Sequence, residues 1–265
     1  MYNELQEIAF SGSVRLMGVA PVKRFAGAPL GHHPCDFNPK ATNVIVIGIP
    51  IPKGVMSYPE MMKGSELIPE SIRLDVLQGY YYRTAGFDII NRALEETCLR
   101  ITLTLEENGF ESLYFAPTFG DQYSSYYDKI RVGLFSLRHA AVRAGLGEFG
   151  LNNLVINPQY GPRVRYAAII TEADFPASPI IKEKACLGFS CAVCIEECGA
   201  HAILLNNKGK EKKKENIWLD PISRTDASLC LSKQNETHCF GRCLAVCPVG
   251  RNSQRLLQKS KIGNT

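Results

Sequence analysis

Residues 184–199, KACLGFSCAVCIEECG, place four cysteines within thirteen residues in the spacing C-x4-C-x2-C-x3-C. A second group follows them along the chain, and Pro248 stands directly after its last cysteine. Eight of the ten cysteines therefore lie after residue 185. Cysteines gathered this closely are expected to be bonded to a shared ligand or to one another. The eight positions are Cys186, Cys191, Cys194, Cys198, Cys230, Cys239, Cys243 and Cys247.

The spacing of these cysteines predicts two iron–sulfur clusters. In ferredoxin-type sites, three closely spaced thiolates hold one cluster, and a fourth cysteine, often followed by proline, crosses to the other cluster. Crossing assigns one 4Fe–4S cluster to Cys186, Cys191, Cys194 and Cys247, and the other to Cys198, Cys230, Cys239 and Cys243. The alternatives are two four-thiolate zinc sites, or disulfides. Zinc ribbons prefer two CxxC pairs, whereas this chain has one, at Cys191 and Cys194.

The composition sets limits on the class of protein. The chain has 265 residues, of which 45% are hydrophobic, enough for one large domain or two smaller ones. Its net charge of +4 is mild, so nucleic acid is not an expected partner. The N-terminus lacks the pattern of a signal peptide, and no apolar run approaches the roughly 20 residues that cross a bilayer. We therefore expect a cytoplasmic protein with no membrane contact, in which reduced thiols favour metal over disulfides.

Helix and strand signals alternate up to about residue 175, which predicts an α/β (α+β) fold. The run NVIVIGIPI at 43–51 is continuously apolar, as in a buried strand. Apolar residues recur every three or four positions from 87 to 105, which predicts a helix with one buried stripe. Beyond residue 178 this periodicity is lost. We predict domains at 1–178 and 179–250, and a tail at 251–265.

The stretch AGLGEFGLNN contains Gly145-x-Gly147-x-x-Gly150, a dinucleotide-binding pattern. That function needs a strand before the glycines and a helix after them, so that the helix N-terminus meets the pyrophosphate. Here the order is reversed, because a helical pattern precedes the glycines and a strand pattern follows. The glycines instead let the backbone pass close to something flat or bulky, or form a tight helix-to-strand turn.

The stretch RHAAVRAGLGEFGLNNLVINPQYGPRVRYAAIIT at 138–171, followed by the double cysteine group, resembles the epoxyqueuosine reductase family and its relatives, the corrinoid-dependent reductive dehalogenases. The resemblance implies a nitroreductase-like module that binds base-off cobalamin, fused to a bacterial-ferredoxin-like domain. It further implies that an external low-potential donor supplies electrons, which pass through two clusters to cobalt. The reaction would be a reductive cleavage or deoxygenation of an unidentified small molecule.

The same resemblance implies roles for particular residues. The family's proton-donating aspartate aligns with Asp88, and Tyr81 belongs to the aromatic stretch before it; the alternative for Asp88 is a solvent-facing carboxylate at a helix start. Where the family loop carries tryptophan and lysine, this chain has Glu148 and Leu151. The implied cobalamin-binding residues are Arg138, His139, Gly145, Leu146, Gly147, Gly150, Asn152, Asn153, Gly161 and Arg163.

Two further functions compete with a cobalamin-dependent reductase. The chain could be a non-catalytic electron-transfer or activating protein that reduces a separate corrinoid protein. It could also bind flavin, because nitroreductase-like folds often do so as dimers, and the same analogy allows a homodimer. Cofactor content distinguishes these three hypotheses.

Overall fold

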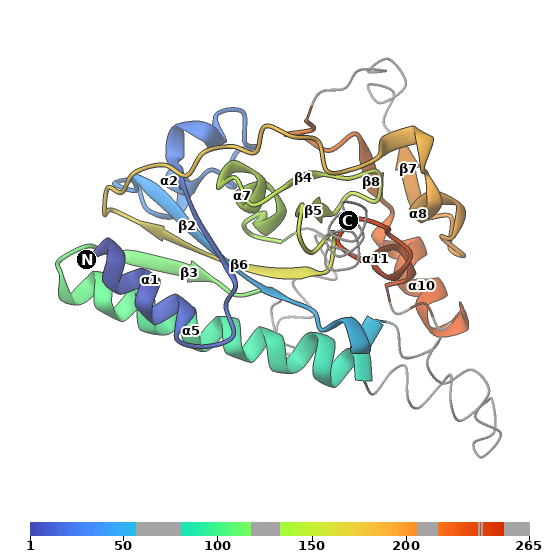
Figure 1. Ribbon diagram of the computed structural model, residues 1–265. Coiled ribbons are helices and arrows are strands. Elements are labelled where there is room, and N and C mark those ends of the chain that lie inside the picture. Colours follow the sequence, from blue (N-terminus) through green and yellow to red (C-terminus); the bar gives the residue numbers. More distant parts are fainter. Residues whose placement is uncertain (57–80, 118–132, 206–216, 238, 240, 252–265) are drawn as a thin grey trace, which may run out of the picture. The chain divides into compact units, whose positions relative to one another are not determined.

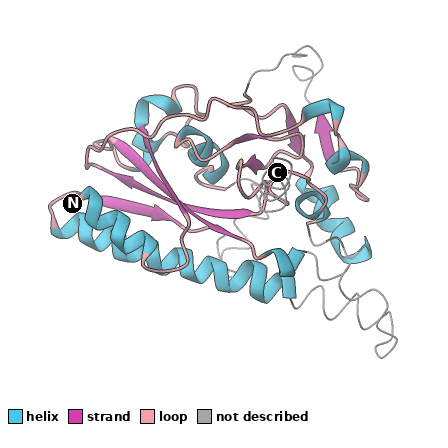
Figure 2. Cartoon of the chain, in the orientation of Figure 1, coloured by secondary structure: helices cyan, strands magenta, loops and turns pink. Residues whose placement is uncertain are grey.

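The computed structural model describes residues 1–56, 81–117, 133–205, 217–237, 239 and 241–251 (Figures 1 and 2). The chain divides into two compact units. The first comprises residues 1–51, 80–146 and 165–181, and the second comprises residues 52–79, 147–164 and 182–265. The boundary predicted near 178 differs from this division in one important respect, since residues 147–164 belong with the cysteine-rich unit. Of the predicted tail, all but Arg251 lies outside the described residues.

The first unit is built on a four-stranded sheet in the order β1-β2-β6-β3. These strands are β1 (Leu16–Pro21), β2 (Asn43–Pro50), β6 (Val164–Thr171) and β3 (Ser112–Phe115). β1 runs antiparallel to β2, and β3 antiparallel to β6. β2 and β6 occupy the middle of the sheet, and seven of the eight residues in each are buried. Burial on both faces explains why the sequence of β2 is apolar without alternation.

Helices cover both faces of this sheet (Figure 1). α1 (Tyr2–Phe10) and α5 (Ile89–Glu107) lie along one face, and α7 (Leu137–Arg143) lies on the other. α5 buries the stripe that its periodicity predicts and leaves Leu99 and Leu103 exposed. The buried stripe includes Ile90, Leu94, Cys98, Ile101 and Leu105. Two short helices, η1 (Val22–Phe25) and α2 (Pro34–Phe37), connect β1 to β2.

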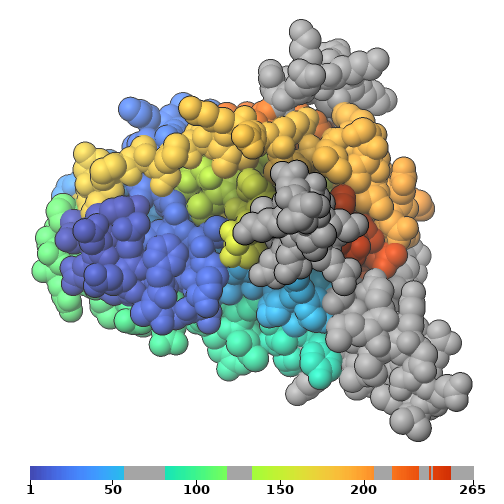
Figure 3. Space-filling view, in the orientation of Figure 1, coloured from blue at the N-terminus to red at the C-terminus, as the bar shows by residue number. Residues whose placement is uncertain are grey.

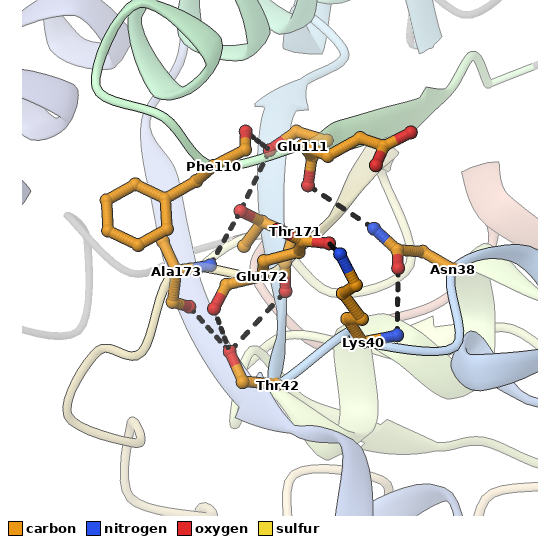
Figure 4. A network of polar contacts seen from close by, with 9 residues as sticks. Asn38, Lys40, Thr42, Phe110, Glu111, Thr171, Glu172 and Ala173 are labelled. Carbon is orange, nitrogen blue, oxygen red and sulfur yellow. Dashed lines mark hydrogen bonds and ion pairs between the residues drawn. The ribbon is translucent and has the colours of Figure 1, made fainter.

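A network of hydrogen bonds lies at the C-terminal end of β6 (Figure 4). The Thr42 hydroxyl donates to the backbone carbonyls of Glu172 and Ala173, at 3.0 and 2.8 Å. The Ser112 hydroxyl donates to the Thr171 hydroxyl at 2.8 Å, and that oxygen accepts a bond from the Ala173 amide at 3.1 Å. These contacts turn the chain out of the sheet. It then continues as residues 172–181, coloured yellow on the surface in Figure 3.

The second unit consists of much shorter elements. Its strands pair antiparallel as β4 (Glu148–Phe149) with β5 (Val155–Ile156), and β7 (Ile203–Leu205) with β8 (Ser223–Thr225). Its helices are η5 (Gly188–Ser190), α8 (Val193–Glu196), α10 (Ala227–Thr237) and α11 (Arg242–Ala245). No helix in the described part of either unit has the length and apolar character to cross a membrane. The α/β class is confirmed, while the nitroreductase-like and ferredoxin-like assignments stay predictions.

Candidate functional site

The four cysteines predicted for the first cluster line one cavity of the second unit. Cys194 and Cys247 are buried, and Cys186 and Cys191 are half-buried. Among the described residues, no three His, Cys, Asp or Glu side chains are placed to hold a single metal ion. A 4Fe–4S cluster is held by four cysteine thiolates, and four cysteines that line one cavity supply that number. The other lining residues are Leu151, Asn152, Ile156, Leu187, Gly188, Ala192, Val193, Pro248 and Val249.

The acidities of these thiols show that they influence one another. Burial raises the pKa of Cys194 to about 12, and the neighbouring thiols of Cys186, Cys247 and Cys191 contribute in the same direction. Burial also raises the pKa of Cys186, while hydrogen bonds from the backbone amides of Gly188 and Leu151 oppose that rise. Amide hydrogen bonds to sulfur are among the interactions that set the reduction potential of an iron–sulfur cluster.

The four cysteines predicted for the second cluster are also brought together. Burial raises the pKa of Cys243 to about 12, with contributions from Cys239, Cys230, Cys198 and, last, Cys194. Cys230 is exposed, and partial burial raises the pKa of its thiol, with contributions from Cys239 and Cys198. The cysteines of the second predicted set therefore lie within electrostatic reach of one another, and Cys243 lies within reach of Cys194 as well. The division of the eight cysteines between two clusters stays a prediction.

The backbone between Cys191 and Cys194 is held in an uncommon conformation. Ala192, the residue before α8, has φ of 43°, in the left-handed region. A residue with a Cβ atom loses roughly 1–2 kcal/mol in this region, so the surrounding structure must stabilise it. The turn begins a four-residue helix that carries Cys194 to the same cavity as Cys191.

The first glycine of the loop at 145–153 ends helix α7. Gly145 has φ of 76°; its amide donates to the Val142 carbonyl at 3.0 Å, and the Leu146 amide donates to the Ala141 carbonyl at 2.9 Å. This pair of bonds is a Schellman motif, which favours glycine at this position. A Cβ atom on Gly145 would also lie 2.0 Å from the Pro179 carbonyl oxygen. The tight helix-to-strand turn, one of the two alternatives from the sequence, is therefore what Gly145 forms.

Glu148, in the same loop, makes contacts that the sequence did not predict. Its side chain is fully buried, and Oε1 accepts hydrogen bonds from the amides of Ala185 at 2.6 Å and Cys186 at 2.8 Å. Oε2 accepts a third bond from the Trp218 amide at 3.0 Å. Residue 148 was visible in the sequence as a departure from the family loop, but nothing local to it indicated partners 37 to 70 residues away.

Arg163 was predicted to meet a corrin, but its contacts lie beside Cys247. The side chain is 5% exposed, and Nη1 donates to the carbonyls of Leu244 at 2.9 Å and Cys247 at 3.0 Å. Nη2 donates to the Val249 carbonyl. A Cβ atom on Gly161 would lie 2.2 Å from that same carbonyl oxygen. The YGPR turn thus holds the segment that carries Cys247.

The remaining residues predicted for cobalamin also serve the chain itself. Gly147 and Gly150 lie close to Ile156, where a Cβ atom on either would be 2.6 Å from its nearest atom. Asn152 is buried and donates to the Cys243 carbonyl at 3.2 Å, and Asn153 is buried at a positive φ of 58°. Leu146 is buried, Arg138 is exposed, and His139 Nδ1 lies 2.6 Å from the Ser136 hydroxyl at the start of α7. These contacts lie within the chain, and a role of these residues in binding cobalamin stays a prediction.

Asp88 and Tyr81 lie at opposite ends of η3 (Tyr81–Asp88), a π-helix that leads into α5. π-helical turns are rare and frequently mark functional sites. The Arg165 guanidinium lies 4.0 Å from the centre of the Phe87 ring, and its Nε donates to Asn91 Oδ1 at 2.5 Å. Burial lowers the pKa of Arg165, and the nearby Tyr82 and Asp88 oppose that shift.

Asp88 is therefore a half-buried carboxylate within electrostatic reach of a cation, whereas Tyr81 is 46% exposed. The sequence predicted Asp88 but not its neighbours. Arg165 belongs to β6, so only the folding of the sheet brings it beside η3.

Similarity to known proteins was found in both sequence and fold. The chain is 23% identical to an epoxyqueuosine reductase of Staphylococcus aureus over 218 residues, which cover 80% of this chain and 49% of that protein. It is 33% identical to a tetrachloroethene reductive dehalogenase of Dehalobacter restrictus over 118 residues, 40% of this chain and 21% of that protein. The chain resembles epoxyqueuosine reductases and reductive dehalogenases. The resemblance predicted from the sequence is confirmed, although no family model matches the chain.

Solved structures of both kinds of reductase share the fold. An epoxyqueuosine reductase from Streptococcus thermophilus superimposes with a TM-score of 0.57 at 16% identity, covering 95% of this chain and 66% of that one. A catabolic reductive dehalogenase gives 0.62 at 16% identity, covering 97% and 33%. An epoxyqueuosine reductase solved with a modified tRNA stem loop gives 0.51 at 20% identity, covering 76% and 52%. The chain spans about half, or less, of the length of the curated relatives it matches.

Proposed function

We propose that this chain is an iron–sulfur, cobalamin-dependent reductase of the epoxyqueuosine reductase type. The observation that supports the proposal is that the four cysteines of one predicted set line one cavity, while those of the other set lie within electrostatic reach of one another. Similarity to two kinds of oxidoreductase supports the same conclusion. When bound, the clusters would supply one-electron transfer, and cobalamin would supply a strongly reducing cobalt.

The residues of the chain divide into ligands and a candidate proton donor. Cys186, Cys191, Cys194 and Cys247 would hold one 4Fe–4S cluster, and Cys198, Cys230, Cys239 and Cys243 the other. Asp88 would donate a proton, and the positive charge of Arg165 lies within electrostatic reach of its carboxylate. Tyr81 is the second candidate donor, and its exposure leaves it open to a substrate in solution.

Support for cobalamin comes from the resemblance and not from the loop at 145–153. Because the loop residues make contacts within the chain, we derive no step of the reaction through the corrin. A cytoplasmic location and a homodimer stay predictions as well.

Two substrate classes follow from the relatives with ligands. One relative was solved with an epoxyqueuosine-modified tRNA stem loop and another with 3-bromo-4-hydroxybenzoic acid. The net charge gave no reason to expect nucleic acid, but the first of these structures makes a tRNA-borne substrate a candidate. Both compounds should therefore be tried as electron acceptors for the reduced protein.

Cofactor analysis of protein prepared without oxygen tests the proposal. We expect about eight irons per chain, the number that two cubanes contain, and cobalt bound after purification in the presence of cobalamin. Zinc in place of iron would contradict the whole proposal. If the protein binds flavin and no cobalt, the proposed clusters stand but the proposed use of cobalamin is contradicted.

Variants then test the proton donor. Asp88→Asn should keep its iron content and lose most of its turnover, because amide nitrogen cannot replace an acidic proton. Glu107→Gln, an exposed carboxylate at the end of α5, is the matched control and should retain wild-type turnover. If wild-type protein is reoxidised only by a separate corrinoid protein, the chain is an electron-transfer protein instead.

A further inference from the structure

Two buried side chains of opposite charge attach to the backbone of two ligands of the same candidate cluster. Glu148 accepts a bond from the amide of Cys186, and Arg163 donates one to the carbonyl of Cys247. Both cysteines line the same cavity. The carboxylate therefore contacts the backbone of the first of these ligands along the chain, and the guanidinium contacts the backbone of the last.

Three backbone amides donate to the side chain of Glu148, which accepts at both oxygens of its carboxylate. Its exposed fraction is 0%, so water does not screen its charge. The charge lies against the backbone of Cys186, whose amide donates to Glu148 Oε1 at 2.8 Å. Lys184, two residues before Cys186, carries the opposite charge, but its side chain is half-buried.

The contacts of Arg163 place a positive charge at the other end of the ligand set. Its guanidinium donates hydrogen bonds to three carbonyls around Cys247. The side chain is only 5% exposed. Arg163 and Glu148 therefore place opposite charges against the backbone of two different ligands of the same candidate cluster, Cys247 and Cys186.

We propose that Glu148 and Arg163 are positioning residues that set the reduction potential of the cluster held by Cys186, Cys191, Cys194 and Cys247. This inference rests on the proposed function, since it requires that cluster. Reduction adds negative charge to a centre that already carries four thiolates, so a nearby carboxylate opposes it and a nearby guanidinium favours it. Both effects are strong because the charges are buried, where the effective dielectric constant is low.

A purely structural role makes a different prediction. If the two side chains only hold loops, replacing either one would lower thermal stability or iron content, and the potential would not respond to the sign of the lost charge. The direction of the shift in reduction potential therefore distinguishes an electrostatic role from a purely structural one, whereas a change in stability does not.

The experiment is a potentiometric titration of the reconstituted protein, followed by electron paramagnetic resonance. Glu148→Gln should make one cluster easier to reduce, and Arg163→Gln should make it harder. We expect each to change the ratio of reduced to oxidised cluster at a fixed potential at least tenfold, which is about 59 mV for one electron. The double variant should lie between them. The second cluster serves as an internal reference.

Controls and conservative variants complete the design. Glu107→Gln and Arg100→Gln remove exposed charges from α5 and should leave both potentials unchanged. Glu148→Asp and Arg163→Lys keep the charge but move it, so smaller shifts in the same two directions are expected. These variants decide the question if a neutral variant does not hold iron.

Three outcomes are distinguishable. Opposite shifts confined to one cluster support the inference. Unchanged potentials, or shifts in the same direction, in variants that hold iron overturn it while leaving the proposed function intact. Wild-type protein that takes up no iron contradicts the proposed function instead.

Discussion

The two units of the molecule are stabilised in different ways. In the first, long elements bury apolar side chains: two strands of eight residues and a helix of nineteen contribute to one core. In the second, most elements have two to four residues, and a buried glutamate and a buried arginine bind backbone groups from distant parts of the chain. Such a unit has less apolar burial to oppose chain entropy, so bound clusters are expected to contribute much of its stability.

The chain provides a separate probe for each unit. Its single tryptophan, Trp218, is buried in the second unit, where the Lys184 ammonium lies 3.8 Å from the centre of the Trp218 ring. The longest helix, α5, belongs to the first unit. Tryptophan fluorescence therefore reports the second unit, and far-ultraviolet circular dichroism is weighted toward the first. A comparison of the two signals tests whether the units respond separately.

The largest effect is expected from losing a cluster ligand. Cys194→Ala should lower the iron content from about eight to about four per chain, because one cubane has lost a buried thiolate. It should also shift the fluorescence-detected unfolding of the second unit to lower denaturant, since the free energy of metal binding is part of the folding free energy. The helical signal of the first unit should persist.

Cys35→Ala is the matched control, because Cys35 belongs to α2 of the first unit. It should retain all the iron. If both units of Cys194→Ala unfolded at the same denaturant concentration, the two units would not be stabilised separately.

The next effect should appear in the first unit. Leu94 is fully buried on α5, and Leu94→Ala should lower the free energy of unfolding by about 2–5 kcal/mol, through lost burial and a residual cavity. Leu99, 45% exposed on the same helix, is the control, and its alanine variant should change stability by about 0.5 kcal/mol or less. Unfolding followed by circular dichroism measures both. Equal effects at the two positions would contradict the assigned core.

The sequence was most informative where one physical signal dominated. The strand β2 follows from an unbroken apolar run, and the buried face of α5 from its periodicity, because burial alone decides both. The spacing of the cysteines predicted their division into two sets of four, since a cluster constrains where its ligands occur along the chain, and this division stays a prediction. Each of these signals is contained in a short window of sequence.

The sequence was least informative where contacts join distant segments. Glu148 and Arg163 bind backbone groups 37 to 86 residues away, and backbone groups carry no residue-specific signal. The interleaving of the two units at residues 147–164 has the same cause. Glycines of the loop looked suited to a large cofactor because close approach to any neighbour, including the chain's own backbone, gives the same pattern.

A smaller loss is expected from the polar network at the end of β6. Thr171→Val removes the hydroxyl that bonds to Ser112 and to the Ala173 amide; Ser112 keeps its bond to the Phe110 carbonyl, but the buried amide of Ala173 loses this acceptor. We expect a loss of about 1–3 kcal/mol in the first unit. Thr104, whose hydroxyl bonds to the Arg100 carbonyl on the exposed side of α5, provides the control variant Thr104→Val. No difference between the two valine variants would argue against the network.

The smallest effect concerns a thiol of the first unit that no cluster uses. Burial, with a contribution from Glu95, raises the pKa of Cys98 far above the usual value of a thiol, about 9.0. Above pH 9 the unfolded chain releases this proton while the folded chain keeps it, so stability falls as pH rises. At pH 10 the loss is about 1.4 kcal/mol for one such group.

Cys98→Ala removes this term while leaving the eight cluster cysteines in place, so their titration cancels in the difference between wild type and variant. That difference in unfolding free energy, followed by circular dichroism, should be constant from pH 6 to 8. By pH 10 the wild type should have lost about 1.4 kcal/mol of unfolding free energy relative to the variant. A constant difference across the whole range would mean that the thiol is not buried in the core of the first unit, where the periodicity of α5 places it.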